Sequence, residues 1–178
     1  MTEEKIKRIN DAVSVHPDFP KPGIDFKNIF PVLRNPSLFK DLIDVMVESV
    51  SKNAEGVKKI VGLDARGFLF GPMIAQALGI GFVPVRKAGK LPGATHSITY
   101  KLEYGQDTFE VEQDSVKQGE KVVIVDDLLA TGGTMKAAYD LVNKAGGEVL
   151  QCLVVMELVD LRGRDKVPNT TVTSLIKY

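Results

Sequence analysis

The run KVVIVDD at residues 121–127 constrains the fold more than any other segment of the chain. Its four consecutive branched apolar residues do not alternate with polar ones, so a strand here would be buried on both faces. Strands buried in this way occur in parallel sheets that helices cover on each side. The run therefore predicts an α/β domain with a mainly parallel sheet.

The segments around this run continue the alternation of strands and helices. Residues 57–63 and 82–87 have the apolar composition of strands, and they enclose an apolar helix at 67–79 that ends at a glycine. A helix at 134–145 is expected to lead from the central run to a further strand at 147–158. This order is typical of a parallel sheet with helical crossovers.

The N-terminal part is predicted to contain two helices. Amphipathic spacing indicates a short helix at 3–15, and PSLFKDLIDVMVESVSK predicts another at 36–52, with Pro36 near its start. Three prolines and a glycine in residues 16–23 favour an ordered, extended excursion after the first helix.

Residues 88–113 interrupt the alternation. A Gly- and Pro-rich stretch precedes two alternating runs, SITYKLEY and DTFEVEQ, which predict a β-hairpin. An insertion of this size in a compact α/β domain is usually functional, and it often forms a lid over an active site.

Composition limits the class of protein. The 178 residues suit a single domain, and 44% hydrophobic with 26% charged residues is ordinary for a globular protein. A formal net charge of zero gives no overall field that would recruit nucleic acid or an anionic membrane. The charged N-terminus lacks the apolar core of a secretory signal, and the single cysteine, Cys152, fits a reducing compartment. We expect a cytoplasmic protein that binds neither nucleic acid nor a membrane.

Two aspartates end the central run, and a loop of small residues follows them. Asp126 and Asp127 come at the carboxyl end of the strand, where open α/β sheets bind ligands. The loop ATGGT leads into a helix whose first amides can bind a phosphate. The carboxylates would repel a phosphate, but they can accept hydrogen bonds from sugar hydroxyls or hold magnesium. Together these features indicate a ribose-5-phosphate site. The alternative to a ligand site is an aspartate that caps the helix beside a tight glycine turn. The Walker A pattern is absent, which argues against a P-loop nucleotidase.

The string VVIVDDLLATGGT resembles the phosphoribosyl pyrophosphate motif of the type I phosphoribosyltransferases, and LLATGGT is similar to the form in members that use adenine. Other matching segments follow in the family's order: DFPKPGIDFKNIFPVL (18–33), GLDARGFLFGP (62–72), RKAGKLPGATHSITYKLEYG (86–105) and ELVDLRGRDKV (157–167). The resemblance implies one domain, residues 1–178, with a mainly parallel twisted sheet flanked by helices. It also implies a hood at about 1–34 and a flexible β-flap at about 86–113.

The resemblance further implies a reaction and its ligands. The chain would transfer the phosphoribosyl group of phosphoribosyl pyrophosphate to N9 of adenine, giving AMP and pyrophosphate. Asp126 and Asp127 would position the ribose hydroxyls. The substrates would hold the cofactor, magnesium (Mg2+), near this pair with no direct protein ligand. The 5-phosphate would be bound by the loop residues Ala130, Thr131, Gly132, Gly133 and Thr134.

By the same resemblance, Asp64, Ala65 and Arg66 would bind pyrophosphate. In the family this loop often contains a cis peptide bond without proline, which here would join Asp64 to Ala65. Arg66 would supply a charge-assisted contact. Family members often have Ser at the Ala65 position, so a hydroxyl contact is missing here. The alternative is a surface turn with a salt bridge between Asp64 and Arg66.

Arg86, Lys87 and Lys90 form a basic cluster at the entrance to the flap, where cations would bind pyrophosphate and help it leave. The resemblance implies that Arg86 reaches the active site of a partner subunit, so a homodimer is expected. A solvated basic loop is the alternative.

The flap would also supply Glu103, which the resemblance assigns to proton exchange with N7 of adenine, and Tyr104, which would pack in the closed lid. The alternative for Glu103 is a solvent-facing position on an edge strand.

The hood would bind the base. Phe26 would stack on the purine, main-chain groups near Ile24 would read its exocyclic amine, and Leu158 would close the pocket from the opposite side. Core packing is the alternative for Phe26 and Leu158. Lys27 stands where the family often has Arg, and it keeps the charge without the planar fork.

Two rival functions stay open at this point. The enzyme could accept another base, such as hypoxanthine or orotate, although Leu158 stands where a hypoxanthine pocket needs a donor such as Lys. A non-catalytic sensor of the sugar donor would need a nucleic-acid surface, and the sequence shows no basic face. His16 and His96 lack partners at metal-ligand spacing, and Cys152 is expected in the core.

Overall fold

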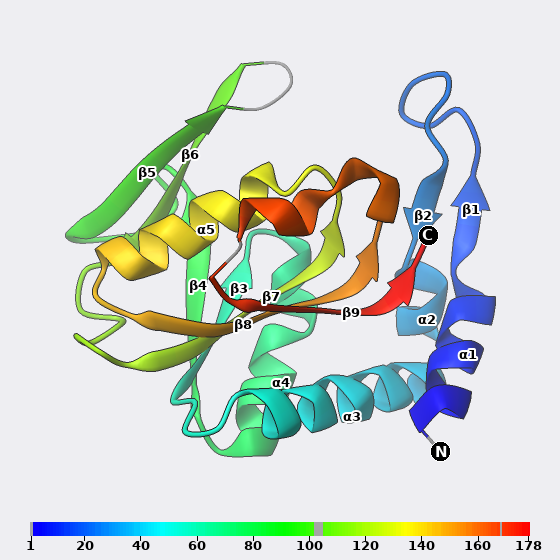
Figure 1. The fold of residues 1–178 in the computed structure, drawn as a ribbon, viewed down its shortest axis with the longest axis horizontal. Coiled ribbons are helices and arrows are strands. Elements are labelled where there is room, and N and C mark those ends of the chain that lie inside the picture. Colours follow the sequence, from blue (N-terminus) through cyan, green and yellow to red (C-terminus); the bar gives the residue numbers. More distant parts are fainter. Residues whose placement is uncertain (1, 102–104, 168) are drawn as a thin grey trace. The chain divides into compact units, whose positions relative to one another are not determined.

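The computed structural model describes residues 2–101, 105–167 and 169–178 (Figure 1). The chain divides into two compact units, Met1–Glu48 and Ser49–Tyr178, and the boundary falls within helix α3 (Pro36–Asn53). Helix α3 confirms the helix expected at 36–52.

The first unit begins with helix α1 (Thr2–Ala12). The helix expected at 3–15 therefore ends early, because β1 (Ser14–His16) pairs antiparallel with β2 (Phe26–Asn28). A short helix, α2 (Phe30–Arg34), follows and leads to α3. Ion pairs fix α1 to the start of α3, since Lys5 and Arg8 both reach Asp41, at 3.3 and 2.9 Å.

In the described part of the second unit, seven strands form one sheet, and its five parallel strands confirm the mainly parallel sheet that was predicted. Strands β5 and β6 extend the sheet as an antiparallel pair beside β4. In sheet order the strands are β5 (Thr95–Lys101), β6 (Gln106–Glu112), β4 (Gly81–Lys87), β3 (Lys59–Leu63), β7 (Lys121–Leu129), β8 (Glu148–Glu157) and β9 (Thr171–Lys177).

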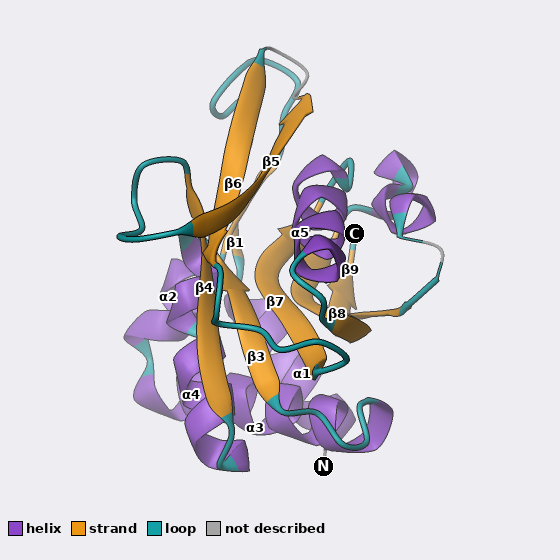
Figure 2. Ribbon diagram, turned by 90° about the vertical axis from the view of Figure 1, so that its left-hand side faces the viewer, coloured by secondary structure: helices purple, strands orange, loops and turns teal. Residues whose placement is uncertain are grey.

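Strand β7 is buried on both faces, as the opening run predicts. Val122 and Ile124 belong to the core cluster beneath helix α5 (Gly133–Lys144), whereas Val123 and Val125 are buried on the other face. Figure 2 shows α5 and helix α4 (Gly71–Leu78) on opposite sides of the sheet. The helix expected at 67–79 is divided, because a 3-10 turn at Arg66–Leu69 precedes α4.

The predicted hairpin is present as β5 and β6, and it is continuous with the sheet. Phe109 and Val111 of β6 are fully buried in the α5 core cluster, and Tyr100 of β5 packs against it. Lys144 Nζ at the end of α5 donates to the carbonyl oxygen of Ser97 at 2.9 Å. The bases of both flap strands are therefore part of the core of the second unit.

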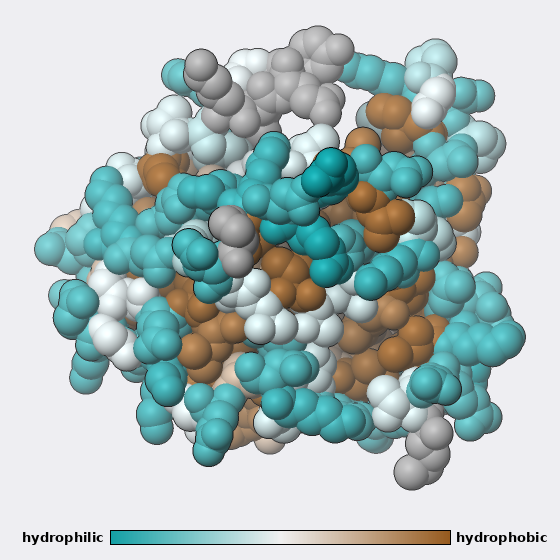
Figure 3. Space-filling view, in the orientation of Figure 1, coloured by the Kyte–Doolittle hydropathy of each residue, from teal (hydrophilic) through white to brown (hydrophobic). Residues whose placement is uncertain are grey.

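Figure 3 shows that hydrophilic side chains cover most of one face, with hydrophobic residues in patches between them. Among residues 2–101, 105–167 and 169–178, none of the helices combines the length and apolar character that crossing a bilayer requires.

Candidate active site at the carboxyl ends of the central strands

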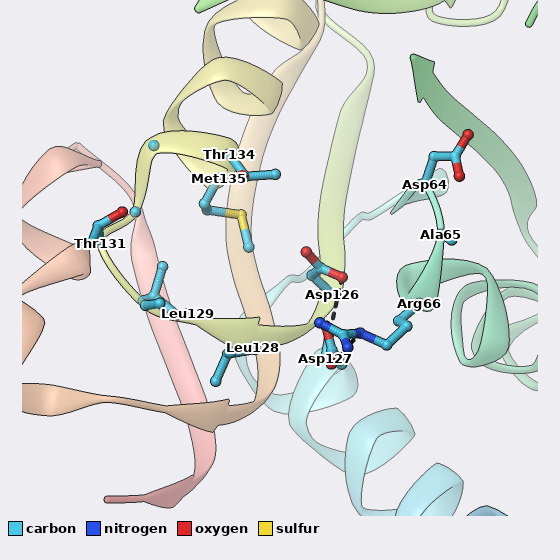
Figure 4. Close-up of a pocket in the computed structure, with 13 residues that line it drawn as sticks. Asp64, Ala65, Arg66, Asp126, Asp127, Leu128, Leu129, Thr131, Thr134 and Met135 are labelled. Atoms are coloured by element: carbon cyan, nitrogen blue, oxygen red, sulfur yellow. Dashed lines mark hydrogen bonds and ion pairs between the residues drawn. The ribbon is translucent and has the colours of Figure 1, made fainter. Parts of the chain in front are cut away.

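A pocket of about 280 Å³ lies at the carboxyl ends of β3 and β7 (Figure 4). It brings together three sequence segments that were expected to act jointly: the loop 64–66, the aspartate pair and the small-residue loop 130–134. Leu128, Leu129 and Met135 also line it and were not expected there. Loops after adjacent parallel strands meet at one edge of the sheet, which explains how residues about sixty positions apart share a pocket.

The small-residue loop turns sharply into α5. Gly132 has a left-handed backbone, with φ of 77°, and it carries no side chain that could cover the amides of the first helical turn. Met135 is buried in the core, so the start of α5 is held firmly against the sheet. This arrangement suits an anion bound by backbone amides and by the hydroxyls of Thr131 and Thr134.

The two aspartates occupy different environments. Asp127 is 4% exposed, and its Oδ2 lies 2.7 Å from Nε of Arg66, the ion pair drawn in Figure 4. Asp126 is half-buried, and its Oδ1 accepts the amide hydrogen of Asp127 at 2.9 Å. Burial raises the pKa of Asp126 well above its usual value, and the neighbouring charge of Asp127 adds to the shift. Burial also raises the pKa of Asp127, while the Arg66 guanidinium opposes that shift.

The loop 64–66 contains the cis peptide bond between Asp64 and Ala65 that the resemblance implied. The alternative of a plain surface turn held by an Asp64–Arg66 salt bridge is wrong. Arg66 pairs with Asp127, and Asp64 accepts a hydrogen bond from Nε of Arg86 at 3.1 Å. Arg66 therefore projects into the pocket with its guanidinium beside the carboxylate pair.

The basic cluster is held by specific partners, which argues against a freely solvated loop. The guanidinium of Arg86 also donates to the carbonyl oxygen of Lys90 at 3.2 Å and lies 5.9 Å from the centre of the Phe68 ring. Lys87 Nζ lies 2.9 Å from Asp107 on β6, and this contact raises the pKa of Lys87. Lys90 is exposed. Whether Arg86 reaches a partner subunit stays a prediction.

A second pocket, of about 580 Å³, lies within the first unit and is mainly aromatic. Phe26 lines it from β2 and makes an edge-to-face contact with Phe19, with ring centres 5.3 Å apart. Core packing is therefore not the role of Phe26. Lys27 follows on the same strand and pairs with Val15 across the two-stranded sheet. Ile24 uses its own amide and carbonyl within the turn, with Lys21 and Phe19 as partners.

Leu158 directly follows β8 and is half-buried, with its amide donating to the carbonyl oxygen of Leu129 at 2.9 Å. This contact places it beside the end of β7, but it does not line the pocket there. Glu103 and Tyr104 lie outside the described residues, so their assigned roles stay predictions.

One neighbour of the site was not expected from the sequence. A Cβ atom on Gly132 would overlap the carbonyl oxygen of Gly163, and one on Gly163 would overlap that of Ala130. The backbone of the 3-10 helix Gly163–Lys166 therefore packs directly on the small-residue loop. The glycine in LRGRDK was the available signal, but a lone glycine does not indicate which backbone it approaches.

Comparisons with known proteins point to one family. Residues 31–177 match the family model of the phosphoribosyl transferase domain. The adenine phosphoribosyltransferase of Caenorhabditis elegans is 47% identical over 182 residues, covering 100% of this chain and 98% of the relative. The human adenine phosphoribosyltransferase is 44% identical over 179 residues, covering 100% and 99%.

A solved structure is similar over nearly its whole length. The crystal structure of Saccharomyces cerevisiae adenine phosphoribosyltransferase, complexed with an imino-altritol bisphosphate and adenine, superposes with a TM-score of 0.91 and 45% identity. The match covers 97% of this chain and 98% of that one. The fold is thus the type I phosphoribosyltransferase fold, and the chain belongs to the phosphoribosyltransferase family, among the adenine phosphoribosyltransferases.

Proposed function

We propose that the protein transfers the 5-phosphoribosyl group of phosphoribosyl pyrophosphate to N9 of adenine, releasing pyrophosphate and forming AMP. The observation that carries this proposal is the single pocket formed by Arg66, the aspartate pair and loop 130–134. It offers a cation for the leaving group, carboxylates for a diol and amides for a phosphate. The adenine specificity is supported by the relatives, which are adenine phosphoribosyltransferases.

The reaction is a displacement at C1 of the ribose. The C1–oxygen bond to pyrophosphate breaks as N9 attacks from the opposite face, so the configuration inverts. Positive charge develops on the sugar towards an oxocarbenium ion, as in glycoside cleavage. No covalent intermediate with the protein is needed.

The two aspartates would have different roles. Asp126 is half-buried in the pocket and would accept hydrogen bonds from the ribose hydroxyls. Asp127 is tied to Arg66 and would orient that guanidinium towards the departing pyrophosphate. Loop 130–134 would bind the 5-phosphate and so fix C1 for attack.

Magnesium fits the chemistry of this pocket. The ribose and pyrophosphate would supply the oxygen ligands that Mg2+ prefers, and the Asp126 carboxylate, which lines the pocket, would lie near the ion. Among the described residues, no group of three or more His, Cys, Asp and Glu side chains could hold a metal by itself. We propose an ion held mainly by the substrates, which when bound would neutralise the charge of the leaving group.

The base would be bound by the aromatic side chains of the first unit, chiefly Phe26. Glu103 would exchange a proton with the purine, and Tyr104 would help to close the flap over it. Closure would exclude water, which would otherwise hydrolyse the activated sugar. We further propose a cytoplasmic location, which the buried free thiol of Cys152 supports and which cell fractionation would test.

A base panel tests the proposed function. Purified protein is mixed with magnesium, the sugar donor and each of adenine, hypoxanthine, guanine and orotate. We expect AMP and pyrophosphate from adenine at a rate at least tenfold above the other bases. Turnover of another base in preference to adenine would reject the specificity, and donor binding without any turnover would favour a sensor.

We also propose a homodimer in which Arg86 serves the partner's site. Mixing two inactive variants tests it, since Arg86→Ala and Asp126→Asn chains would together form mixed dimers with one complete site each. We expect the mixture to recover activity after subunit exchange. A monomer in sedimentation experiments, or a mixture as inactive as its components, would contradict the proposal.

A further inference from the structure

We infer that Arg164, which lies outside the pocket, is a positioning residue for the phosphate-binding loop. It acts by holding the 3-10 helix Gly163–Lys166 against residues 130–132. The inference rests on the proposed function, because it assumes that loop 130–134 binds the 5-phosphate of the donor and of AMP.

The first step is the contact between two backbones. A Cβ atom on Gly132 would come within 2.8 Å of both the Cα and the carbonyl carbon of Gly163. A Cβ atom on Gly163 would come within 2.9 Å of the Gly132 amide nitrogen. Neither position has room for a methyl group, so the backbone of the 3-10 helix packs directly against the backbone of the loop.

The second step concerns the contacts that hold the 3-10 helix in place. Glu157, the last residue of β8, is 1% exposed, and both of its carboxylate oxygens are bound by Arg164. Nε of Arg164 donates to Oε1 at 2.7 Å while Nη2 donates to Oε2, the two-pronged geometry that fixes direction as well as distance. The Ser174 hydroxyl on β9 donates to the same carboxylate at 2.6 Å.

The anchor of the pair is therefore the rigid sheet. Glu157 stands opposite Leu129 in the pairing of β7 and β8. Leu129 is the residue immediately before the loop against which the 3-10 helix packs. The guanidinium lowers the pKa of Glu157, so the carboxylate stays ionised at neutral pH. Removing the guanidinium would leave a buried charge without its main partner, and the 3-10 helix would lose its fixed position.

The same segment provides a matched control. Arg162 and Asp165 also form an ion pair, at 2.8 Å, but their side chains are 80% and 52% exposed. Exposed pairs contribute little to the position of a backbone. Loss of a charge from the segment and loss of the Glu157 contact can thus be separated by comparing Arg162→Gln with Arg164→Gln.

The test measures binding of ribose 5-phosphate and of AMP by titration calorimetry, together with steady-state constants for the donor and adenine. In Arg164→Gln we expect about tenfold weaker binding of both phosphates and a similar rise in the donor KM, equivalent to about 1.4 kcal/mol. The KM for adenine and kcat at saturating donor should stay within about twofold. Arg164→Lys should have phosphate affinities between those of the parent protein and Arg164→Gln, because an ammonium keeps the charge but not the planar fork.

Gly163→Ala serves as a second variant if Arg164→Gln fails to fold. It leaves the ion pair intact and pushes on the loop directly, so the same selective loss of phosphate affinity is expected. Equal ribose 5-phosphate affinity in Arg164→Gln and Arg162→Gln would overturn the inference, as would equal losses in phosphate and adenine binding. A parent protein that binds ribose 5-phosphate but does not convert adenine would instead reject the proposed function alone.

Discussion

Replacing Gly132 with alanine should damage catalysis far more than its effect on stability suggests. The left-handed backbone, with φ of 77°, costs a residue with a side chain about 1–2 kcal/mol. The new methyl group would also lie 2.2 Å from the carbonyl oxygen of Gly163, which is 1.2 Å inside the 3.4 Å at which ordinary contact begins. The overlapping atoms all belong to the backbone of Gly163, so the loop itself must move by about that amount. A displacement of about 1 Å in a substrate-positioning element lowers catalysis by up to about 100-fold.

Gly119→Ala is the matched control. Gly119 has a similar φ of 71°, but no atom lies within 4 Å of the place that an alanine Cβ would occupy there. Gly119→Ala should lose about 1–2 kcal/mol of folding free energy, or roughly 2–8 °C in Tm for a chain of this size, and Gly132→Ala at least as much because its methyl group also overlaps Gly163. Only Gly132→Ala should lower kcat/KM for the sugar donor, by about 10- to 100-fold. Kinetic constants for Gly132→Ala within twofold of those for Gly119→Ala would refute the reasoning, because the contact with Gly163 would then be without consequence.

Three further outcomes are expected. Because the pKa of Asp126 is raised in the folded protein, its contribution to stability is present below the unfolded value of 3.8 and is lost as pH rises through the folded value. Asp126→Asn should therefore raise Tm at neutral pH and flatten its pH dependence while reducing donor turnover; a lower Tm would contradict this. Chelation of magnesium by EDTA should abolish turnover reversibly, and full activity in EDTA would exclude the proposed ion. Phe26→Ala should raise the KM for adenine by about tenfold with little change in the donor KM, and the opposite pattern would remove Phe26 from the base site.

Most strands of the sheet could be predicted because their burial is visible in the sequence pattern. Strand β7 is apolar on both faces, and α5 carries its apolar residues at helical spacing, so both were predicted within two residues of their ends. Strand β9 was missed, since its sequence TVTSLIK alternates weakly and most of its residues are only half-buried. Strands β1 and β2 were missed because three residues each give no measurable period.

The sequence named the three segments that meet in the pocket, but not the contacts between them. The motifs identified Arg66 and Asp127 separately, and the sequence assigned them to different ligands. Their ion pair depends on how two loops distant in the sequence face each other, which no local pattern encodes. The packing of Gly163 on Gly132 was missed for the same reason.

The packing of strands β5 and β6 limits how the protein can be shortened. Phe109 and Val111 fill the space beneath α5, and α5 begins at loop 130–134. Deleting residues 95–112 to obtain a permanently open enzyme would remove part of the interior together with the lid. The resulting chain would expose the apolar side of α5 to water and would aggregate. The two strands that we propose as the lid thus also complete the interior of the second unit.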